Sequence, residues 1–240
     1  MLTGLPEGDR HARRAVASSA LAPFVQYRPE RVPVDEGLRR GQALHDLLAQ
    51  RRSVRFFSSD PVPAEAIDLA VRTANTAPSG AHQQPWTFVA VRGPETRHRI
   101  RLAAEAEERA FYGRDDLPEW HGALARLETG ADKEYLGVVP WIVVVFAQKY
   151  STDPTGRRRK HYYVNESVGI ACGMFISSLH AMGLATLPHT PNPMGFLNDI
   201  LGRPGSERPY ILFPVGYPAA DCEVPDLARK PLEQALVHHP

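Results

Sequence analysis

The stretch PWIVVVF, residues 140–146, is an unbroken apolar run with the length of a β-strand. A run that lacks alternating polar side chains is typical of a strand buried on both faces of a sheet. The segments WTFVAV at 86–91 and YILFPV at 210–215 also have strand character, and a shorter strand is expected at 184–187. Helical segments alternate with these strands along the chain, so the sequence predicts the α/β or α+β class around one sheet.

Helical patterns occupy the intervals between the predicted strands. Helical spacing of apolar side chains, or a high content of helix formers, is found at residues 38–50, 64–77, 95–109, 163–182 and 196–201. Gly183 follows the longest of these segments and suits the left-handed conformation that ends many helices. Helices and strands alternate without an internal repeat, so we expect a globular domain rather than a repeat array.

The size and charge of the chain limit its partners. A chain of 240 residues with 43% hydrophobic side chains can bury a full core, and we expect one domain at residues 39–240 after an irregular arm at residues 1–38. The net charge of +1 and the pI of about 7.9 give no strong field for nucleic acid or an anionic membrane. A small-molecule partner is therefore the default expectation.

Two cysteines, Cys172 and Cys222, lie far apart in the sequence and form no CxxC motif. This spacing fits neither a disulfide scaffold nor a zinc site, so we expect no metal centre and a reducing compartment. No apolar run approaches the roughly 20 residues that span a bilayer, and charges interrupt the N-terminal segment where a signal peptide needs an apolar core. The expected location is the cytoplasm, with no membrane partner.

Three arginines gather in the segment RRSVR, where Arg51, Arg52 and Arg55 surround Ser53. Guanidinium groups bind phosphate in a bidentate manner and the hydroxyl adds a further hydrogen bond, so the segment suits a phosphate monoester. From the cluster alone, a solvated basic turn after a helix is the simpler interpretation. The signatures GxGxxG and GxxxxGK[ST] are both missing from the sequence, so neither of these nucleotide-binding loops is indicated.

A second candidate segment is the turn Pro78-Ser79-Gly80, which precedes the strand at 86–91. Gly80 has no Cβ and Ala81 has a small side chain, so the backbone here allows close approach of a planar ligand. On its own this turn is only a loop. Together with the arginine segment, it indicates a site for a phosphorylated aromatic cofactor.

Several segments in a fixed order resemble one protein family. RRSVRFFSSDPVP, TAPSGAHQQPWTFV, HYYVNESVGIACG and VPDLARKPL look like the iodotyrosine deiodinases of the FMN-dependent nitroreductase superfamily, and the similarity spans about residues 45–235. The resemblance implies a nitroreductase-like mixed α/β sheet flanked by helices. It also implies an intertwined homodimer with one FMN in each of two clefts at the interface.

The resemblance assigns the cofactor contacts to a few short segments. It implies that the FMN phosphate is held by Arg51, Arg52, Ser53 and Arg229, that Arg55 meets the pyrimidine edge, and that the ring is surrounded by Val54, Pro78, Ser79, Gly80, Pro188, His189 and Thr190. The hydroxyl of Thr190 falls where the family places a donor against the flavin N5 nitrogen. Such a donor favours transfer of electrons one at a time, which makes Thr190 the expected catalytic residue. Pro188 and His189 stand where animal members have further threonines.

Three side chains, Glu108, Tyr112 and Lys133, match the grip that this family places on the amino-acid end of its substrate. A zwitterion needs an anion for its ammonium and donors for its carboxylate, held together away from water. Glu108 and Tyr112 are four residues apart, which places them on one face of a helix. Without the family spacing, both charged residues would be read as solvated. The amide of Ala81 is expected to meet the phenolate, and residues 108–133 to close as a lid.

The resemblance implies an FMN-dependent enzyme that removes halide reductively from 3-halotyrosines. NADPH, another reductant or a separate flavin reductase supplies the electrons. The shared RxSxR and QPW elements leave a generic nitro or quinone reductase as the nearest alternative, and a flavin-fragmenting enzyme as a further one. A protein that senses flavin or halotyrosine without turnover is the non-enzymatic alternative, since Pro188 and His189 alter the flavin neighbourhood.

Overall fold

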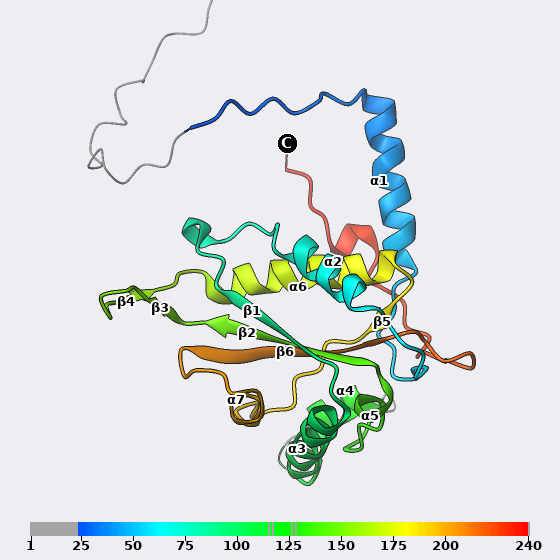
Figure 1. The fold of residues 1–240 in the computed structure, drawn as a ribbon. Coiled ribbons are helices and arrows are strands. Elements are labelled where there is room, and N and C mark those ends of the chain that lie inside the picture. Colours follow the sequence, from blue (N-terminus) through cyan, green and yellow to red (C-terminus); the bar gives the residue numbers. More distant parts are fainter. Residues whose placement is uncertain (1–23, 115, 117, 126, 128, 240) are drawn as a thin grey trace, which may run out of the picture. The chain divides into compact units, whose positions relative to one another are not determined.

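The computed structural model describes residues 24–114, 116, 118–125, 127 and 129–239 (Figure 1). The chain divides into two compact units, Met1–Ala43 and Leu44–Pro240. Residues 24–33 of the first unit contain no helix or strand, and helix α1, Val34–Ala49, follows them. The helix therefore begins earlier than its apolar pattern predicts. The rest of the predicted arm, residues 1–23, lies outside the described part of the chain.

The second unit is built on a four-stranded sheet in the order β1-β2-β6-β5. Its strands are β1 Trp86–Val91, β2 Trp141–Gln148, β5 Ala185–Thr186 and β6 Glu207–Gly216, and neighbouring strands are antiparallel. A parallel bridge from Ser53 to Thr186 adds to the β5 edge. All four strands lie close to the positions that their apolar runs predict.

Strand β2 is buried on both faces of the sheet, as its sequence predicts. Val143 and Val145 belong to one hydrophobic cluster, whereas Ile142, Val144 and Phe146 belong to a second. All five side chains are fully shielded from solvent. Because successive side chains of a strand point to opposite faces, one apolar run supplies the centre of both halves of the core.

Helices α2, Ala64–Ala74, and α6, Val164–Ala181, cover one face of the sheet (Figure 1). Phe175 and Leu179 of α6 are fully buried in the cluster that joins these helices to the strands. Gly183 follows the end of α6 with a φ of +76°, so it has the left-handed conformation that its position predicts.

Helices α3, Pro94–Tyr112, α5, Tyr135–Val138, and α7, Phe196–Leu201, cover the opposite face (Figure 1). Ile100 of α3 and Leu136 of α5 are fully buried against the second hydrophobic cluster. A sheet with helices on both faces confirms the predicted fold class. It also places α3 and the segment before α5 on the same side of the sheet.

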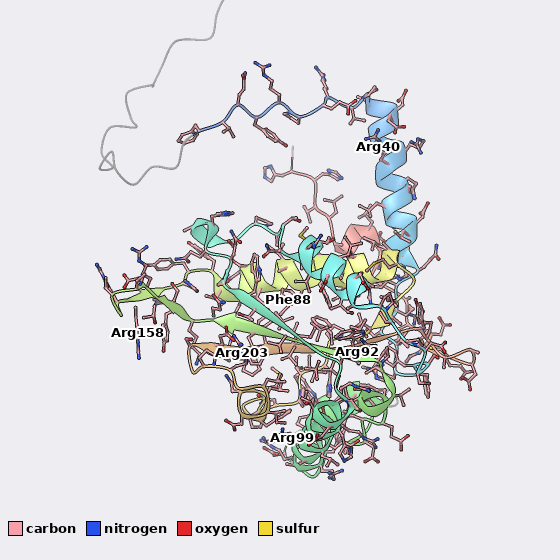
Figure 2. All side chains as sticks on the ribbon, in the orientation of Figure 1. Arg40, Phe88, Arg92, Arg99, Arg158 and Arg203 are labelled. Carbon is pink, nitrogen blue, oxygen red and sulfur yellow. The ribbon has the colours of Figure 1, made fainter. Side chains whose placement is uncertain are left out.

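Two features escape the sequence patterns. Strands β3, Tyr150–Thr152, and β4, Arg158–Lys160, form a separate two-stranded ribbon, and helix α4, Pro118–Ala125, lies within the predicted lid. The ribbon carries polar and basic side chains without apolar alternation, so no strand signal marks it. Arg158 lies on this ribbon, with its guanidinium 4.7 Å from the centre of the Tyr150 ring (Figure 2).

Candidate active site

A cavity of about 870 Å³ lies between α3, the segment before α5 and the segment that joins β5 to α7. Its lining brings together predicted site residues from four separate parts of the sequence: Arg55, Glu108, Tyr112, Lys133, Pro188, His189 and Thr190. The cavity wall also contains aromatic side chains, among them Phe111, Trp120 and Tyr210. A mostly apolar hollow with a few convergent charged groups is the usual form of a small-molecule site.

Glu108 stands at the centre of the charged groups in this cavity. Its Oε2 lies 3.4 Å from Lys133 Nζ, and its Oε1 lies 2.9 Å from His189 Nε2. The side chains of Glu108, Lys133 and His189 are only 12%, 4% and 8% exposed. We call these three residues the Glu108 cluster. Charges held this close and this far from water interact more strongly than they do on a surface.

The Glu108 cluster shifts the titration of each of its members. Burial alone raises the pKa of Glu108, but the hydrogen bond from His189 and the charge of Lys133 outweigh it, so the pKa lies below the ordinary value of 4.5. Burial lowers the pKa of Lys133 and of His189, and Glu108 offsets part of each change. Near neutral pH the cluster therefore holds an ionised carboxylate on Glu108 and a neutral imidazole on His189, and the carboxylate favours the charged form of Lys133.

Lys133 is held in place by an acid that the sequence did not single out. Its backbone N–H donates to Glu105 Oε1 at 2.9 Å, and the same oxygen accepts a bond from Arg101 Nε at 2.7 Å. Glu105 is 5% exposed and lies one turn before Glu108 on α3. The spacing of two acids on one helix was the only sequence signal for this role. Lys133 Nζ also donates to the Gly130 carbonyl.

Tyr112 occupies the last residue of α3 and faces the Glu108 cluster. Its hydroxyl donates to the Thr129 carbonyl at 3.0 Å, and its ring centre lies 5.7 Å from Lys133 Nζ. Burial raises the pKa of the Tyr112 phenol, so the hydroxyl stays a donor at neutral pH. Residues 115, 117, 126 and 128 of the predicted lid lie outside the described part of the chain, so closure of this segment stays a prediction.

Arg55 joins the first cavity to a second one of about 680 Å³, which Ser53 also lines. The Nε of Arg55 is buried and has no hydrogen-bond partner among the described residues. A buried guanidinium nitrogen without a partner is costly, so this position favours a ligand with an acceptor atom. Val54 differs from its neighbours, because its side chain packs in the core and its N–H donates to Thr186 O at 3.3 Å.

The other predicted phosphate ligands gather near the carboxyl end of α6. Arg229 donates to the carbonyls of Ala49 and Arg51 at 2.9 and 2.8 Å, which ties the C-terminal tail to the arginine segment. Burial lowers the pKa of Arg51, and the charges of Arg229 and Arg52 lower it further. No carboxylate within the described ranges forms an ion pair with these three arginines. Such a cluster suits a dianion.

The turn Pro78-Ser79-Gly80 is not brought to either cavity. Gly80 N donates to Ser167 Oγ at 3.2 Å, at the start of α6. A Cβ on Gly80 would lie 2.8 Å from the carbonyl oxygen of Tyr162, so chain packing requires glycine here. Ser79 Oγ accepts a bond from Gln84 N at 2.9 Å, and Ala81 is exposed with a left-handed φ of 50°. None of these four residues lines the cavities described above.

The two halves of the predicted cofactor site therefore lie at opposite ends of α6. Arg51 and Arg52 line a small cavity of about 250 Å³ with His180 and Gly183, at the carboxyl end of the helix. Gly80 contacts the amino end. Since α6 has 18 residues, these ends are separated by about 27 Å. One mononucleotide does not reach both groups within a single chain.

Comparison with known proteins identifies relatives of this chain. The model of the Nitroreductase family matches residues 48–217. An iodotyrosine deiodinase from Haliscomenobacter hydrossis is 45% identical over 214 residues, which cover 89% of this chain and 96% of the relative. Iodotyrosine deiodinase 1 from Homo sapiens is 45% identical over 206 residues, which cover 85% of this chain and 71% of the human protein.

Solved structures agree with the sequence relatives. The crystal structure of oxidised iodotyrosine deiodinase bound to FMN and 3-iodo-L-tyrosine superposes with a TM-score of 0.69 and 29% identity, covering 82% of this chain and 98% of that one. A BluB-like flavoprotein from Clostridium difficile, at 20% identity and a TM-score of 0.63, shares the fold.

The family match, the fold and the relatives point to one assignment. The chain belongs to the nitroreductase family, whose model spans most of the second unit. Within that family it belongs with the iodotyrosine deiodinases, since nearly half of its residues are identical to theirs across most of the chain. The resemblance drawn from the short segments is thereby confirmed.

Proposed function

We propose that this protein binds FMN and uses it to remove halide reductively from 3-halotyrosines, releasing tyrosine. The observation that carries the proposal is the convergence of Glu108, Tyr112 and Lys133 in one cavity with Arg55 and Thr190. That cavity combines the groups that a zwitterion and a flavin require, in a chain whose relatives are iodotyrosine deiodinases. A generic nitro or quinone reductase has no need of a buried grip for a zwitterion.

The donor groups of this chain fit FMN. The Arg51, Arg52 and Arg229 cluster suits the phosphate, because it concentrates positive charge without a carboxylate partner in the described chain. Arg55 suits the electron-rich pyrimidine edge, because its buried Nε lacks an acceptor. When bound, FMN supplies the two electrons that replace a carbon–halogen bond with a carbon–hydrogen bond. We place the Thr190 hydroxyl at the flavin N5, since Thr190 lines the same cavity as Arg55.

The Glu108 cluster suits a free amino acid. Glu108 takes the ammonium of the substrate, while Lys133 and the Tyr112 hydroxyl take its carboxylate. The two charged side chains already lie 3.4 Å apart, so an entering zwitterion replaces their direct contact with two contacts of the same charge pattern. Burial of both side chains strengthens these contacts, since little water competes for them. The halogenated phenol then lies toward the flavin and the cavity wall.

The proposed reaction needs only electrons and a proton besides the halotyrosine. Each turn consumes the halotyrosine, two electrons from the reduced cofactor and one proton from solvent, and it yields tyrosine and halide. Glu108, Tyr112 and Lys133 bind and orient the substrate, and the aromatic side chains of the cavity wall exclude water.

We propose NADPH, another reductant or a separate flavin reductase as the source of electrons, and the cytoplasm as the location. The two free cysteines favour a reducing compartment. No helix within the described ranges is long and apolar enough to cross a membrane.

We propose that the active form is a homodimer in which Pro78, Ser79, Gly80 and Ala81 serve the cavity of the second copy. The loop is too far from the arginine cluster of its own chain, at opposite ends of α6. α6 also exposes Ile170, which is 46% exposed, on a helix that is mostly apolar. A helix that is apolar on most of its surface usually has a partner on each side. A second copy supplies that partner and completes each site.

Halide release tests the proposed function directly. The purified protein is loaded with FMN, reduced with dithionite without oxygen, and mixed with 3-iodotyrosine. We expect iodide and tyrosine in equal amounts, because one carbon–iodine bond is cut for each tyrosine formed. The same protein without reductant is the control. Absence of iodide from a preparation that holds reduced FMN would reject the proposal.

Ligand binding separates the remaining alternatives. Fluorescence of the oxidised flavin is titrated with 3-iodotyrosine, tyrosine and a nitroarene. We expect strong quenching by the halotyrosine, because its acidified phenol and its zwitterion are both recognised. A generic reductase binds the nitroarene without preference for the amino acid. A sensor binds 3-iodotyrosine but releases no iodide in the first experiment.

A further inference from the structure

His189 has contacts that differ from its expected place beside the flavin ring. Its Nε2 lies 2.9 Å from Glu108 Oε1, and the residue is 7% exposed. Its backbone exchanges two hydrogen bonds with Leu212, at 2.8 and 2.9 Å, and its ring meets the edge of Tyr135 with the centres 6.1 Å apart. The imidazole is therefore fixed from the sheet side and directed at the Glu108 carboxylate.

The hydrogen bonds define which nitrogen of His189 carries the proton. An ionised carboxylate only accepts hydrogen bonds, so Nε2 donates to Glu108. The Nδ1 atom is buried and has no partner among the described residues. A proton on Nδ1 would therefore be an unsatisfied buried donor. The imidazole is neutral, with its hydrogen on Nε2.

The neighbouring charges support the same state. Glu108 faces the imidazole from α3, Lys133 from the segment before α5, and Arg55 from the segment after α1. The phenols of Tyr112 and Tyr135 complete the ionisable groups around these charges, and burial raises the pKa of both. A protonated imidazole would be a third cation beside a single carboxylate. Burial accordingly holds the pKa of His189 below 6.5, although Glu108 raises it in part.

A neutral donor has a specific advantage at this position. A carboxylate offers about four lone-pair sites, and His189 occupies one of those on Oε1. The remaining sites stay open to an incoming ammonium while the carboxylate is held in one orientation. A cationic side chain in place of the imidazole would fix Glu108 equally well but would repel that ammonium.

We propose that His189 is a positioning residue, which acts as a neutral imidazole to fix the Glu108 carboxylate for the ammonium of an α-amino-acid substrate. The inference rests on the proposed function for the identity of the substrate. It assigns His189 to substrate recognition rather than to the flavin ring. It also predicts that halotyrosine affinity falls when the pH drops far enough to protonate His189.

Two substitutions distinguish the hydrogen-bond donor of His189 from its imidazole ring. His189→Gln keeps an N–H donor at about the distance of Nε2, whereas His189→Asn is too short to reach Glu108. The probe is 3-iodotyrosine, titrated into the FMN-loaded protein by flavin fluorescence. We expect the dissociation constant to rise roughly 10-fold to 100-fold in His189→Asn, and His189→Gln to recover to within about threefold of the original, since a bond to a charged group is lost only in the former.

The same titration with 2-iodophenol identifies the part of the ligand that His189 serves. This probe has the halogenated ring but no ammonium or carboxylate, so we expect His189→Asn to weaken it far less than 3-iodotyrosine. Equal losses for the two probes would overturn the proposal, because they would place the effect at the flavin or in folding. Unchanged affinity for 3-iodotyrosine in His189→Asn would overturn it as well.

The protonation state has its own readouts. Between about pH 7 and about pH 5, we expect the affinity for 3-iodotyrosine to fall more steeply in the original protein than in His189→Gln, because protonation of the ligand phenol affects both proteins alike. Parallel curves would contradict a role for the imidazole. Nitrogen NMR of the FMN-loaded protein, labelled at histidine, should show a protonated Nε2 and an unprotonated Nδ1 for His189 at neutral pH. The reverse pattern would overturn the proposed role of His189. Because this NMR measurement does not depend on iodide release, the proposal for His189 and the proposed dehalogenation can fail separately.

Discussion

The Glu108 cluster and the Pro78–Ala81 loop were both expected to contact ligand, yet they differ in burial and in their distance from the other predicted site residues. The cluster is assembled within one chain, and its three side chains are buried. Lys133 Nζ lies 3.4 Å and His189 Nε2 lies 2.9 Å from the Glu108 carboxylate oxygens. The loop contacts Ser167 and Tyr162 at the far end of α6, and Ala81 is exposed. The cluster is formed by one chain, whereas the loop lies apart from the arginine cluster of its own chain, which is why we propose that it serves a second copy.

This difference separates two kinds of sequence signal. A motif reports that a segment is suited to a ligand, but it does not report which copy of the chain holds that ligand. The cluster depends on contacts across one fold, while the loop, under the proposed dimer, would depend on a second copy. Experiments that alter one region at a time therefore test the dimer and the substrate grip independently.

Complementation between damaged copies gives the largest expected effect. Arg51→Gln removes a proposed phosphate ligand, and Pro78→Trp obstructs the loop at an exposed position. We expect each variant alone to retain little FMN. Co-expressed with different tags, the mixed dimer should hold about one FMN per two chains, because one of its two sites combines an intact arginine cluster with an intact loop.

Absorbance of the purified mixed dimer measures this stoichiometry. If the loop and the arginine cluster served the same site within one chain, every site of the mixed dimer would contain one damaged element. The mixed dimer would then hold no more FMN than either variant alone. Size-exclusion chromatography of each variant confirms that the dimer itself survives both substitutions.

Lys133→Gln is expected to have the next largest effect. The amide keeps the approximate size of the side chain but leaves Glu108 without its cation and the substrate without a partner for its carboxylate. We expect kcat/KM for 3-iodotyrosine to fall about 100-fold, as for loss of a buried charged hydrogen bond. Steady-state iodide release measures it, and Lys149→Gln, an exposed lysine, is the matched control. Equal effects of the two substitutions would remove Lys133 from the site.

Much of this arrangement was predictable from local patterns. The apolar run of β2 correctly predicted a strand buried on both faces, and the four-residue spacing of Glu108 and Tyr112 correctly placed both on α3. Lys133 was assigned through a family pattern, and the structure brings it to Glu108. Helix periods and strand lengths are set by neighbours in sequence, so they are visible there.

Other features depend on distant contacts and left no local signal. Glu105 is one acid among several on α3, and only the fold shows that it holds the Lys133 backbone. A contact of His189 with the flavin stays a prediction, and sequence spacing gave no sign of its bond to Glu108, because spacing does not give the direction of a side chain. Close approach of a ligand at Gly80 stays a prediction, and the structure adds a packing reason for glycine that the sequence did not show, since the atom closest to its absent Cβ belongs to Tyr162 of the same chain.

Gly80→Ala tests the packing of the loop, with a smaller expected effect. The added Cβ would lie 2.8 Å from the Tyr162 carbonyl oxygen and 2.9 Å from Tyr163 Cδ2, so the backbone must shift. We expect a loss of about 1–3 kcal/mol in the free energy of unfolding, as for overpacking. Urea denaturation of the FMN-loaded protein measures it. Gly195→Ala, where a Cβ meets nothing within 4 Å, is the control and should change the free energy little. Similar losses in both variants would contradict this packing argument.

The difference in acid dependence between the original protein and Glu108→Gln gives the smallest expected effect, and it reports on the Glu108 cluster rather than on the Pro78–Ala81 loop, which has no ionisable side chain. Burial works against ionisation of Glu108, yet His189 and Lys133 leave its pKa below 4.5 in the folded protein. A carboxyl with a depressed pKa adds stability above its unfolded pKa and loses it as the pH falls through the folded value. We therefore expect the original protein to lose stability below about pH 4.5 that Glu108→Gln does not lose.

The comparison is made by urea denaturation at several pH values. At neutral pH Glu108→Gln should be the less stable protein, because it leaves Lys133 buried without its carboxylate. The difference between the two proteins should then narrow as the pH falls, since protonation of Glu108 removes the same charge from the original. A difference that stays constant down to about pH 3 would mean that the carboxylate contributes no pH-dependent stability, and that the cluster is held by packing rather than by charge.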